Sequence, residues 1–93
     1  MNDVITVRFF SVNRNIPDIE CDSVHLPVSD NMKGDFSGTY GIRKGHAKAV
    51  FSLKPGNVAL FSKGKAIFSA EISDGFATIE NNLLCITVSS LNE

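Results

Sequence analysis

Hydrophobic and polar residues alternate along most of this chain with the two-residue period of β-strands. In residues 4–12 (VITVRFFSV), Ile5, Val7 and Phe9 fall on one side and the intervening residues fall on the other. Residues 21–27 (CDSVHLP) alternate in the same way, with the valine and leucine predicted inward and the serine and histidine outward. Both segments are therefore predicted strands.

Two pairs of later segments have the pattern of β-hairpins. Residues 57–62 and 66–72 flank the turn sequence Lys-Gly-Lys. Residues 76–80 and 83–89 flank an Asn-Asn pair, and asparagine tolerates the left-handed backbone angles of tight turns. Each pair is predicted to form two antiparallel strands.

Prolines limit two further segments. Residues 16–20 contain Pro17, which cannot donate a ladder hydrogen bond, so an edge strand or a bulge is predicted there. Residues 47–53 form a short run that stops at Pro55 and Gly56, which favours a strand over a helical turn.

Residues 28–46 are predicted to form one long, glycine-rich loop. Serine, aspartate, asparagine and four glycines dominate this segment, and few of its side chains are apolar enough to anchor it. Long loops in compact domains either carry function or are mobile, and the sequence leaves both alternatives open.

The composition agrees with a single all-β domain that spans residues 1–93. Hydrophobic residues make up 43% of the chain and charged residues 20%, which is ordinary for a globular protein. Valine, isoleucine and the seven phenylalanines suit a pleated, half-buried surface. About eight to ten short strands and no helix of useful length predict a two-sheet β-sandwich or flattened barrel.

Charge is distributed unevenly along the chain. Residues 33–65 hold seven basic residues against one acid, Asp35, which gives a local balance of +6. Residues 1–32 carry two bases and five acids, a balance of -3, and residues 66–93 carry four acids and no base. Such a distribution could steer an anionic partner, although alternating strands can spread the charges over several faces.

Nucleic-acid binding is an alternative hypothesis for the basic segment. Arg43, Lys44 and Lys48, near Tyr40, are residues of the kinds that bind phosphates and stack on a base. One tyrosine and no tryptophan make a poor stacking platform, so a solvated face or an acidic protein partner is favoured and no nucleic-acid partner is expected.

No catalytic site, metal site or cofactor is expected. Cys21 and Cys85 are too few for a disulfide scaffold, and without an export signal or a long apolar run we expect a cytoplasmic chain with reduced thiols. Cys21 and His25 would share a strand face and could join Cys85 around a metal, but strand residues four apart lie about 13 Å from each other. The serines and glycines match neither a hydrolase elbow nor a phosphate-binding loop.

Four segments together carry a family resemblance. Residues 41–47 (GIRKGHA) and 53–56 (LKPG) resemble the signature of ATP synthase epsilon subunits, usually written G-[IV]-x-P-G-H-A-P and then L-x-P-G. Residues 21–27 resemble the V-E-S-V-V-V-P segment of that family, and residues 72–79 (ISDGFATI) are similar to I-S-G-G-F-x-E-V. The resemblance covers about residues 4–90 and is to the N-terminal β-sandwich of the epsilon subunit of F-type ATP synthase, called delta in mitochondria.

The resemblance implies a non-catalytic rotor subunit without a cofactor of its own. One sandwich face would pack on the gamma subunit, the loop end would touch the c-ring, and contact with the membrane would be indirect, at its inner face. His46 is expected first to brace its loop and second to contact a partner. The residues expected at the ring-facing end are Asp35, Tyr40, Ile42, Arg43 and His46.

Glycines and one proline of the matching segments are expected to specify shape. At such positions the chain must turn or pass close to another strand, where a Cβ atom would clash. These residues are Gly41, Gly45, Pro55, Gly56 and Gly75.

The chain departs from the family pattern in three ways. Lys44 and Lys48 stand where the family has prolines, and the loop between Pro27 and Gly41 is longer than usual. The sequence ends at Glu93, where the family begins two regulatory helices, so the fold is expected without a C-terminal helical hairpin and without the inhibition or ATP binding of those helices. An alternative is a stand-alone sandwich domain whose lengthened loop binds another protein.

Overall fold

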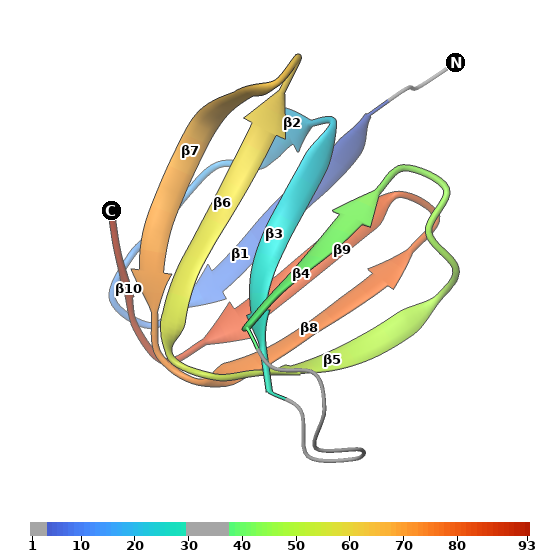
Figure 1. Cartoon of the computed structure of the whole chain (residues 1–93). Coiled ribbons are helices and arrows are strands. Elements are labelled where there is room, and N and C mark those ends of the chain that lie inside the picture. Colours follow the sequence, from blue (N-terminus) through green and yellow to red (C-terminus); the bar gives the residue numbers. More distant parts are fainter. Residues whose placement is uncertain (1–3, 30–37) are drawn as a thin grey trace.

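Every regular element in the described part of the chain is a β-strand (Figure 1). The computed structural model describes residues 4–29 and 38–93. The all-β prediction is confirmed. The strands are β1 (Ile5–Ser11), β2 (Ile19–Cys21), β3 (Ser23–Val28), β4 (Gly38–Arg43), β5 (Ala49–Leu53), β6 (Gly56–Ser62), β7 (Lys65–Ile72), β8 (Gly75–Glu80), β9 (Leu83–Val88) and β10 (Leu91–Asn92).

Hydrogen bonds join these strands into one continuous sheet that curls over on itself. The order is β10-β7-β6-β3-β5-β8-β9-β1-β2, and β4 pairs with β3 beside this path. Because β3 and β5 are in register only at Val28 and Leu53, this contact is the fold line between two layers. The first layer contains β10, β7, β6, β3 and β4, and the second contains β5, β8, β9, β1 and β2 (Figure 1). The predicted two-layer sandwich is confirmed, in the form of a curled half-barrel.

The chain crosses from the second layer to the first between β5 and β6. The Lys54 amide donates a hydrogen bond of 2.9 Å to the carbonyl oxygen of Pro27, which fixes the corner to the end of β3. Pro55, which has no amide hydrogen to satisfy, is exposed at this corner. A Cβ atom on Gly56 would lie 2.9 Å from the Cβ atom of Pro27, so the corner requires a glycine at this position.

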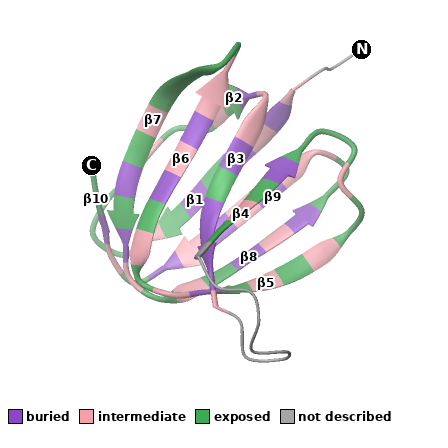
Figure 2. Ribbon diagram, viewed as in Figure 1, coloured by how far each residue is buried: buried purple, intermediate pink, exposed green. Residues whose placement is uncertain are grey.

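The core lies between the two layers, and buried residues recur at every second position of most strands (Figure 2). Ile5 and Val7 are fully buried and Phe9 is 8% exposed, so the inward side predicted for the first strand is confirmed. The rings of Phe9 on β1 and Phe68 on β7 lie 5.5 Å apart between their centroids and join the layers. The largest fully buried side chains are Ile5, Leu26, Ile42, Leu60, Ile79, Leu84, Ile86 and Leu91.

Both predicted hairpins are present. The β6–β7 turn places Lys63 at φ 54° and Gly64 at φ 80°, and the β8–β9 turn places Asn81 at φ 53° and Asn82 at φ 62°. These left-handed angles suit tight two-residue turns between antiparallel strands. The prediction of an edge strand near Pro17 is confirmed in part, since β2 lies at one end of the strand order but covers only Ile19–Cys21.

The prediction of one loop over residues 28–46 is wrong for its second half. Gly38–Arg43 form strand β4, which pairs antiparallel with all six residues of β3, from Val28↔Gly38 to Ser23↔Arg43. Tyr40 and Ile42 point inward, so a two-residue alternation was present in a segment rich in glycine and polar residues. The strand propensity of this segment is low, but its pairing with β3 supplies backbone hydrogen bonds. These bonds outweigh the low propensity.

Cys21 and His25 do not share a face, so the premise of the candidate metal set is wrong. Cys21, at the end of β2, is 1% exposed, whereas His25 on β3 points to solvent. Cys85 lies half-buried on β9 in the other layer, and both cysteines are free thiols. Among residues 4–29 and 38–93, no group of three histidine, cysteine or acidic side chains is placed to hold a metal ion.

The two thiols should differ strongly in reactivity. Burial, together with the neighbouring Asp22 carboxylate, raises the pKa of the Cys21 thiol to about 11, so its reactive thiolate is scarce near neutral pH. We expect iodoacetamide at pH 8 to label Cys85 first, and Cys21 only as the protein unfolds. Mass spectrometry of tryptic peptides measures the order, with the protein in urea as the control. Equal labelling of both cysteines in the folded protein would contradict the burial of Cys21.

Candidate functional site

An aromatic cluster closes the open side of the sandwich at the end of β4. Tyr40 on β4 and Phe51 on β5 come from opposite layers, and their ring centroids lie 5.0 Å apart. The ring of His46, from the loop after β4, lies 6.0 Å from Tyr40 and 5.9 Å from Phe51. The three half-buried rings pack together and hold the loop against both layers.

Both ring nitrogens of His46 have partners within the protein. Nδ1 lies 2.7 Å from the carbonyl oxygen of Ala47, which can only accept, so Nδ1 carries the hydrogen. Nε2 lies 3.1 Å from the Tyr40 hydroxyl and accepts from it when the imidazole is neutral. The prediction that His46 braces its loop is therefore confirmed, whereas its contact with a partner stays a prediction.

The loop that carries His46 is also fixed to the second layer. The Gly45 amide donates a hydrogen bond of 2.7 Å to Oδ1 of Asn82 in the β8–β9 turn. Gly45 itself has a φ of 79°, a left-handed angle that favours glycine. The His46 amide lies 3.3 Å from the Arg43 carbonyl oxygen and closes the turn. The Asn-Asn turn thus positions the histidine loop as well as joining two strands.

Removing the Tyr40 hydroxyl should loosen this loop. We expect Tyr40→Phe to lower the free energy of unfolding by about 0.5–1.5 kcal/mol, because the ring packing remains and one hydrogen bond to His46 is lost. Urea unfolding followed by far-ultraviolet circular dichroism measures the loss. Thr39→Ser, a change at the exposed neighbouring residue, is the control and should change stability little. A Tyr40→Phe protein as stable as the wild type would mean that the hydroxyl does not brace His46.

The structure separates the five residues expected at the ring-facing end. Arg43 is exposed, and Tyr40 and His46 are half-buried within the aromatic cluster. Ile42 is 0% exposed and belongs to the core, so its assignment as a partner-contacting residue is wrong. Asp35 lies outside the described residues. Because the Tyr40 ring is packed between His46 and Phe51, it is not an open platform for a stacked base.

The structural requirement for glycine differs among the glycines of the matching segments. Gly75 is tightly enclosed, since an added Cβ atom would lie 2.1 Å from the carbonyl oxygen of Thr87. Gly41 is in the middle of β4, where an added Cβ atom would make an ordinary contact of 3.6 Å with His25. The interpretation of Gly41 as a turn or close-approach glycine is therefore wrong.

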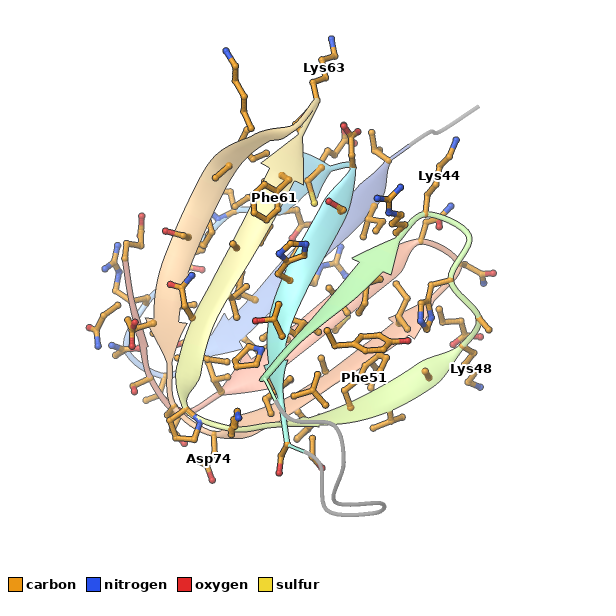
Figure 3. The ribbon with its side chains drawn as sticks, in the orientation of Figure 1. Lys44, Lys48, Phe51, Phe61, Lys63 and Asp74 are labelled. Carbon is orange, nitrogen blue, oxygen red and sulfur yellow. The ribbon has the colours of Figure 1, made fainter. Side chains whose placement is uncertain are left out.

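The basic segment of the sequence is spread over several places in the fold. Lys63 projects from the β6–β7 turn, and Lys44 projects from the far end of β4 (Figure 3). Nζ of Lys48, before β5, lies 4.0 Å from Oε2 of Glu80 in an exposed ion pair. Alternating strands have thus distributed the charge, with Arg43 and Lys44 remaining together beside the aromatic cluster.

The second layer presents an apolar outer face that the sequence analysis did not identify as a site. Phe10 on β1 and Phe76 on β8 are both in register with Thr87 on β9, so they flank it on one face. Phe10 is 51% exposed, Phe76 is 50% exposed, and Val50 on neighbouring β5 is 71% exposed. The sequence did contain a signal for this face, which is an aromatic residue at an outward position of a strand. Phe10, for example, lies on the side of the first strand that faces away from Ile5, Val7 and Phe9.

A solvated ion pair borders this apolar outer face. Arg8 on β1 contacts Asp18 through Nε and one terminal nitrogen, the latter at 2.9 Å. The hydrogen bond and charge of Arg8 hold the pKa of Asp18 below its ordinary value, and the same pair raises the pKa of Arg8. The pair joins β1 to the segment before β2 and leaves the phenylalanines uncovered.

These features define a small β-sandwich that offers an apolar face and a braced, partly basic loop to neighbouring molecules. The model of the family described as ATP synthase, Delta/Epsilon chain, beta-sandwich domain, matches residues 4–92. The chain belongs to this family.

Solved structures of ATP synthases contain similar folds. One is the Euglena gracilis mitochondrial ATP synthase, OSCP/F1/c-ring, with a TM-score of 0.79 and 18% identity over 98% of this chain and 54% of that one. Another is the Tetrahymena thermophila mitochondrial ATP synthase, central stalk and c-ring, with a TM-score of 0.72 and 10% identity over 96% of this chain and 66% of that one. The chain therefore spans between half and two thirds of the length of these two chains. No curated protein matches the sequence.

In the described ranges, no helix is long and apolar enough to cross a membrane.

Proposed function

We propose that this chain is a non-catalytic rotor subunit of an F-type ATP synthase, and that it links the gamma shaft to the membrane c-ring. Membership of the delta/epsilon family over residues 4–92 is the observation that carries the proposal. The similar folds in F1/c-ring and central-stalk structures support it. In this role the chain does mechanical work, without a cofactor, at the cytoplasmic face of the membrane.

The apolar outer face of the second layer is our candidate for the contact with gamma. A stable interface buries about 800 Å² on each partner and places aromatic anchors at its centre. Phe10, Phe76 and Val50 supply such anchors on one face, whereas the outer face of the first layer carries His25, Gly41 and Ala59 and, within its described strands, Ile67 as its one exposed large hydrophobic residue. The contrast between the two faces favours the apolar one as the protein contact.

Co-purification with gamma from the same organism tests both the role and the face. We expect the wild type to bind gamma and the double variant Phe10→Asp with Phe76→Asp to lose binding. The double variant adds two charges, so each of its single variants is compared with the matched control Ile67→Asp, which adds one charge at an equally exposed apolar residue, 48% exposed, of the first layer. Failure of the wild type to bind would count against the rotor role and favour the stand-alone sandwich, whereas loss of binding only in the control would assign the other face.

The exposed residues beside the aromatic cluster are our candidates for the contact with the c-ring. Arg43 and Lys44 are both exposed there, and charges at the edge of an interface mainly affect association rates and specificity. Reversal of both charges, Arg43→Glu with Lys44→Glu, is expected to weaken attachment of the assembled F1 to the ring. Unchanged attachment would remove these two residues from the interface.

A further inference from the structure

The outer face of the first layer carries a hollow that lies away from the apolar outer face and borders the His46 loop of the aromatic cluster. Its walls are Ser23 and His25 on β3 and Arg43 on β4, and its floor is the bare backbone of Gly41. The hollow has a volume of about 420 Å³. A second hollow of about 350 Å³ adjoins it across the same wall residues and extends to Phe61 on β6.

Gly41 leaves this floor open, although neither its backbone angles nor its neighbours require a glycine there. It is not among the glycines with positive φ, and a Cβ atom there would meet only His25, at 3.6 Å from Cδ2 and 3.9 Å from Nε2. A glycine inside a strand weakens the strand and often marks a place where a ligand approaches the backbone. The missing side chain leaves the Nε2 edge of His25 facing the space above β4.

Two polar groups at this hollow, the Arg43 guanidinium and the His25 imidazole, are not engaged elsewhere in the described part of the chain, whereas Lys44 and His46 have interactions of their own. The Arg43 guanidinium takes part in none of the ion pairs formed within residues 4–29 and 38–93. The His25 ring packs on the Phe61 ring, at 4.6 Å between centroids and 50° between planes, and its nitrogens have no hydrogen bond to any described residue. Lys44 and His46 also line the hollow, and none of its own lining residues is acidic. The adjoining hollow includes Asp22, whose Oδ2 accepts a hydrogen bond of 2.6 Å from the Lys63 amide.

We propose that this hollow binds a phosphate group. Guanidinium and imidazole donors from neighbouring strands converge with the Ser23 hydroxyl over an uncovered backbone, and a phosphate has more acceptor oxygens for such a set than a carboxylate has. The group can belong to a free phosphate or to a lipid head group, since both present the same oxygens. The proposal goes beyond the rotor role and does not depend on the contact with gamma.

Titration of the ¹⁵N-labelled full chain with sodium phosphate, against sodium chloride of equal ionic strength, tests the site. We expect saturable shifts at Ser23, His25, Gly41 and Arg43, with half-saturation on the order of 1 mM. Arg43→Gln should raise the dissociation constant at least about tenfold, because a charge-assisted hydrogen bond is lost. Gly41→Ala, which the structure accommodates, should also weaken binding by covering the floor. Lys65→Gln, which removes an exposed charge outside the hollow, is the matched control and should bind as the wild type does.

Sedimentation with vesicles distinguishes the two sources of phosphate. Vesicles of phosphatidylcholine with phosphatidic acid should bind the wild type and not Arg43→Gln if the ligand is a lipid head group, whereas only the solution titration responds if it is a free phosphate. Either result supports the site. The absence of saturable shifts at these residues, or equal shifts in Arg43→Gln and the wild type, would overturn it. Co-purification with gamma is a separate measurement, so the rotor role can fail or stand independently.

Discussion

Replacing Gly75 with alanine is expected to lower the free energy of unfolding by more than about 3 kcal/mol. The new Cβ atom would lie 2.1 Å from the carbonyl oxygen of Thr87 and 2.9 Å from Cγ1 of Val88, so β8 and β9 would have to separate. Gly75 is also in register with Leu53 on β5. A shift of β8 at this residue would therefore disturb its pairing with both β5 and β9. For a chain of 93 residues, whose total stability is about 5–14 kcal/mol, this is a large loss.

Gly64→Ala is the matched control for this prediction. Gly64 has a φ of 80° and nothing within 4 Å of an added Cβ atom, so alanine there meets only the cost of a left-handed backbone, about 1–2 kcal/mol. Urea unfolding followed by far-ultraviolet circular dichroism compares the two variants. Equal losses in Gly64→Ala and Gly75→Ala would show that the contact with Thr87 is not what restricts residue 75.

Replacing Ile42 with alanine is expected to lower the free energy of unfolding by about 2–5 kcal/mol. The side chain is 0% exposed, and its removal leaves a cavity between the two layers beneath β4. Because β3 is the one strand that pairs with β4 among the described residues, inward anchors such as Ile42 hold it to the core. The same unfolding measurement gives the size of the loss.

The neighbouring residue provides the control for Ile42. Arg43 is exposed and makes no ion pair with a described residue, so Arg43→Ala should change stability by no more than about 0.5 kcal/mol. The two adjacent positions of one strand therefore predict opposite phenotypes, instability for Ile42→Ala and altered binding for Arg43→Ala. If Ile42→Ala were as stable as Arg43→Ala, β4 would not be anchored by its inward face.

The two outer faces of the sandwich differ in a way that separates the proposed gamma contact from the proposed phosphate site. The second layer exposes Phe10 and Phe76, whose burial against a protein partner is favourable because it removes apolar surface from water. The first layer exposes Arg43 and His25 over the bare backbone of Gly41, which suits an anion. A gamma subunit on the second layer leaves the hollow of the first layer accessible, whereas the proposed c-ring contact shares Arg43 and Lys44 with the hollow and would compete with phosphate.

The sequence predicted the elements whose signal is local. The alternation of Ile5, Val7 and Phe9 identified the buried side of β1, because a strand reverses the direction of its side chains at each residue. The turn chemistry of Asn81 and Asn82 located the β8–β9 hairpin, because their left-handed angles are a property of the residues themselves. The family signature added the identity of the sandwich, which periodicity alone does not distinguish from other all-β folds.

Tertiary structure decided everything that depends on which segments become neighbours. The alternation in residues 4–12 does not indicate that β1 pairs in parallel with β9, because a strand offers the same hydrogen-bonding groups to any partner. Gly38–Arg43 become a strand only because β3 lies beside them, and Ile42 is buried for the same reason. Phe51 joins Tyr40 and His46 across the two layers, and Arg43 and His25 line the same hollow from two strands. Local pattern thus determined the strands and their inward sides, whereas the assembly of candidate sites required contacts between residues distant in sequence.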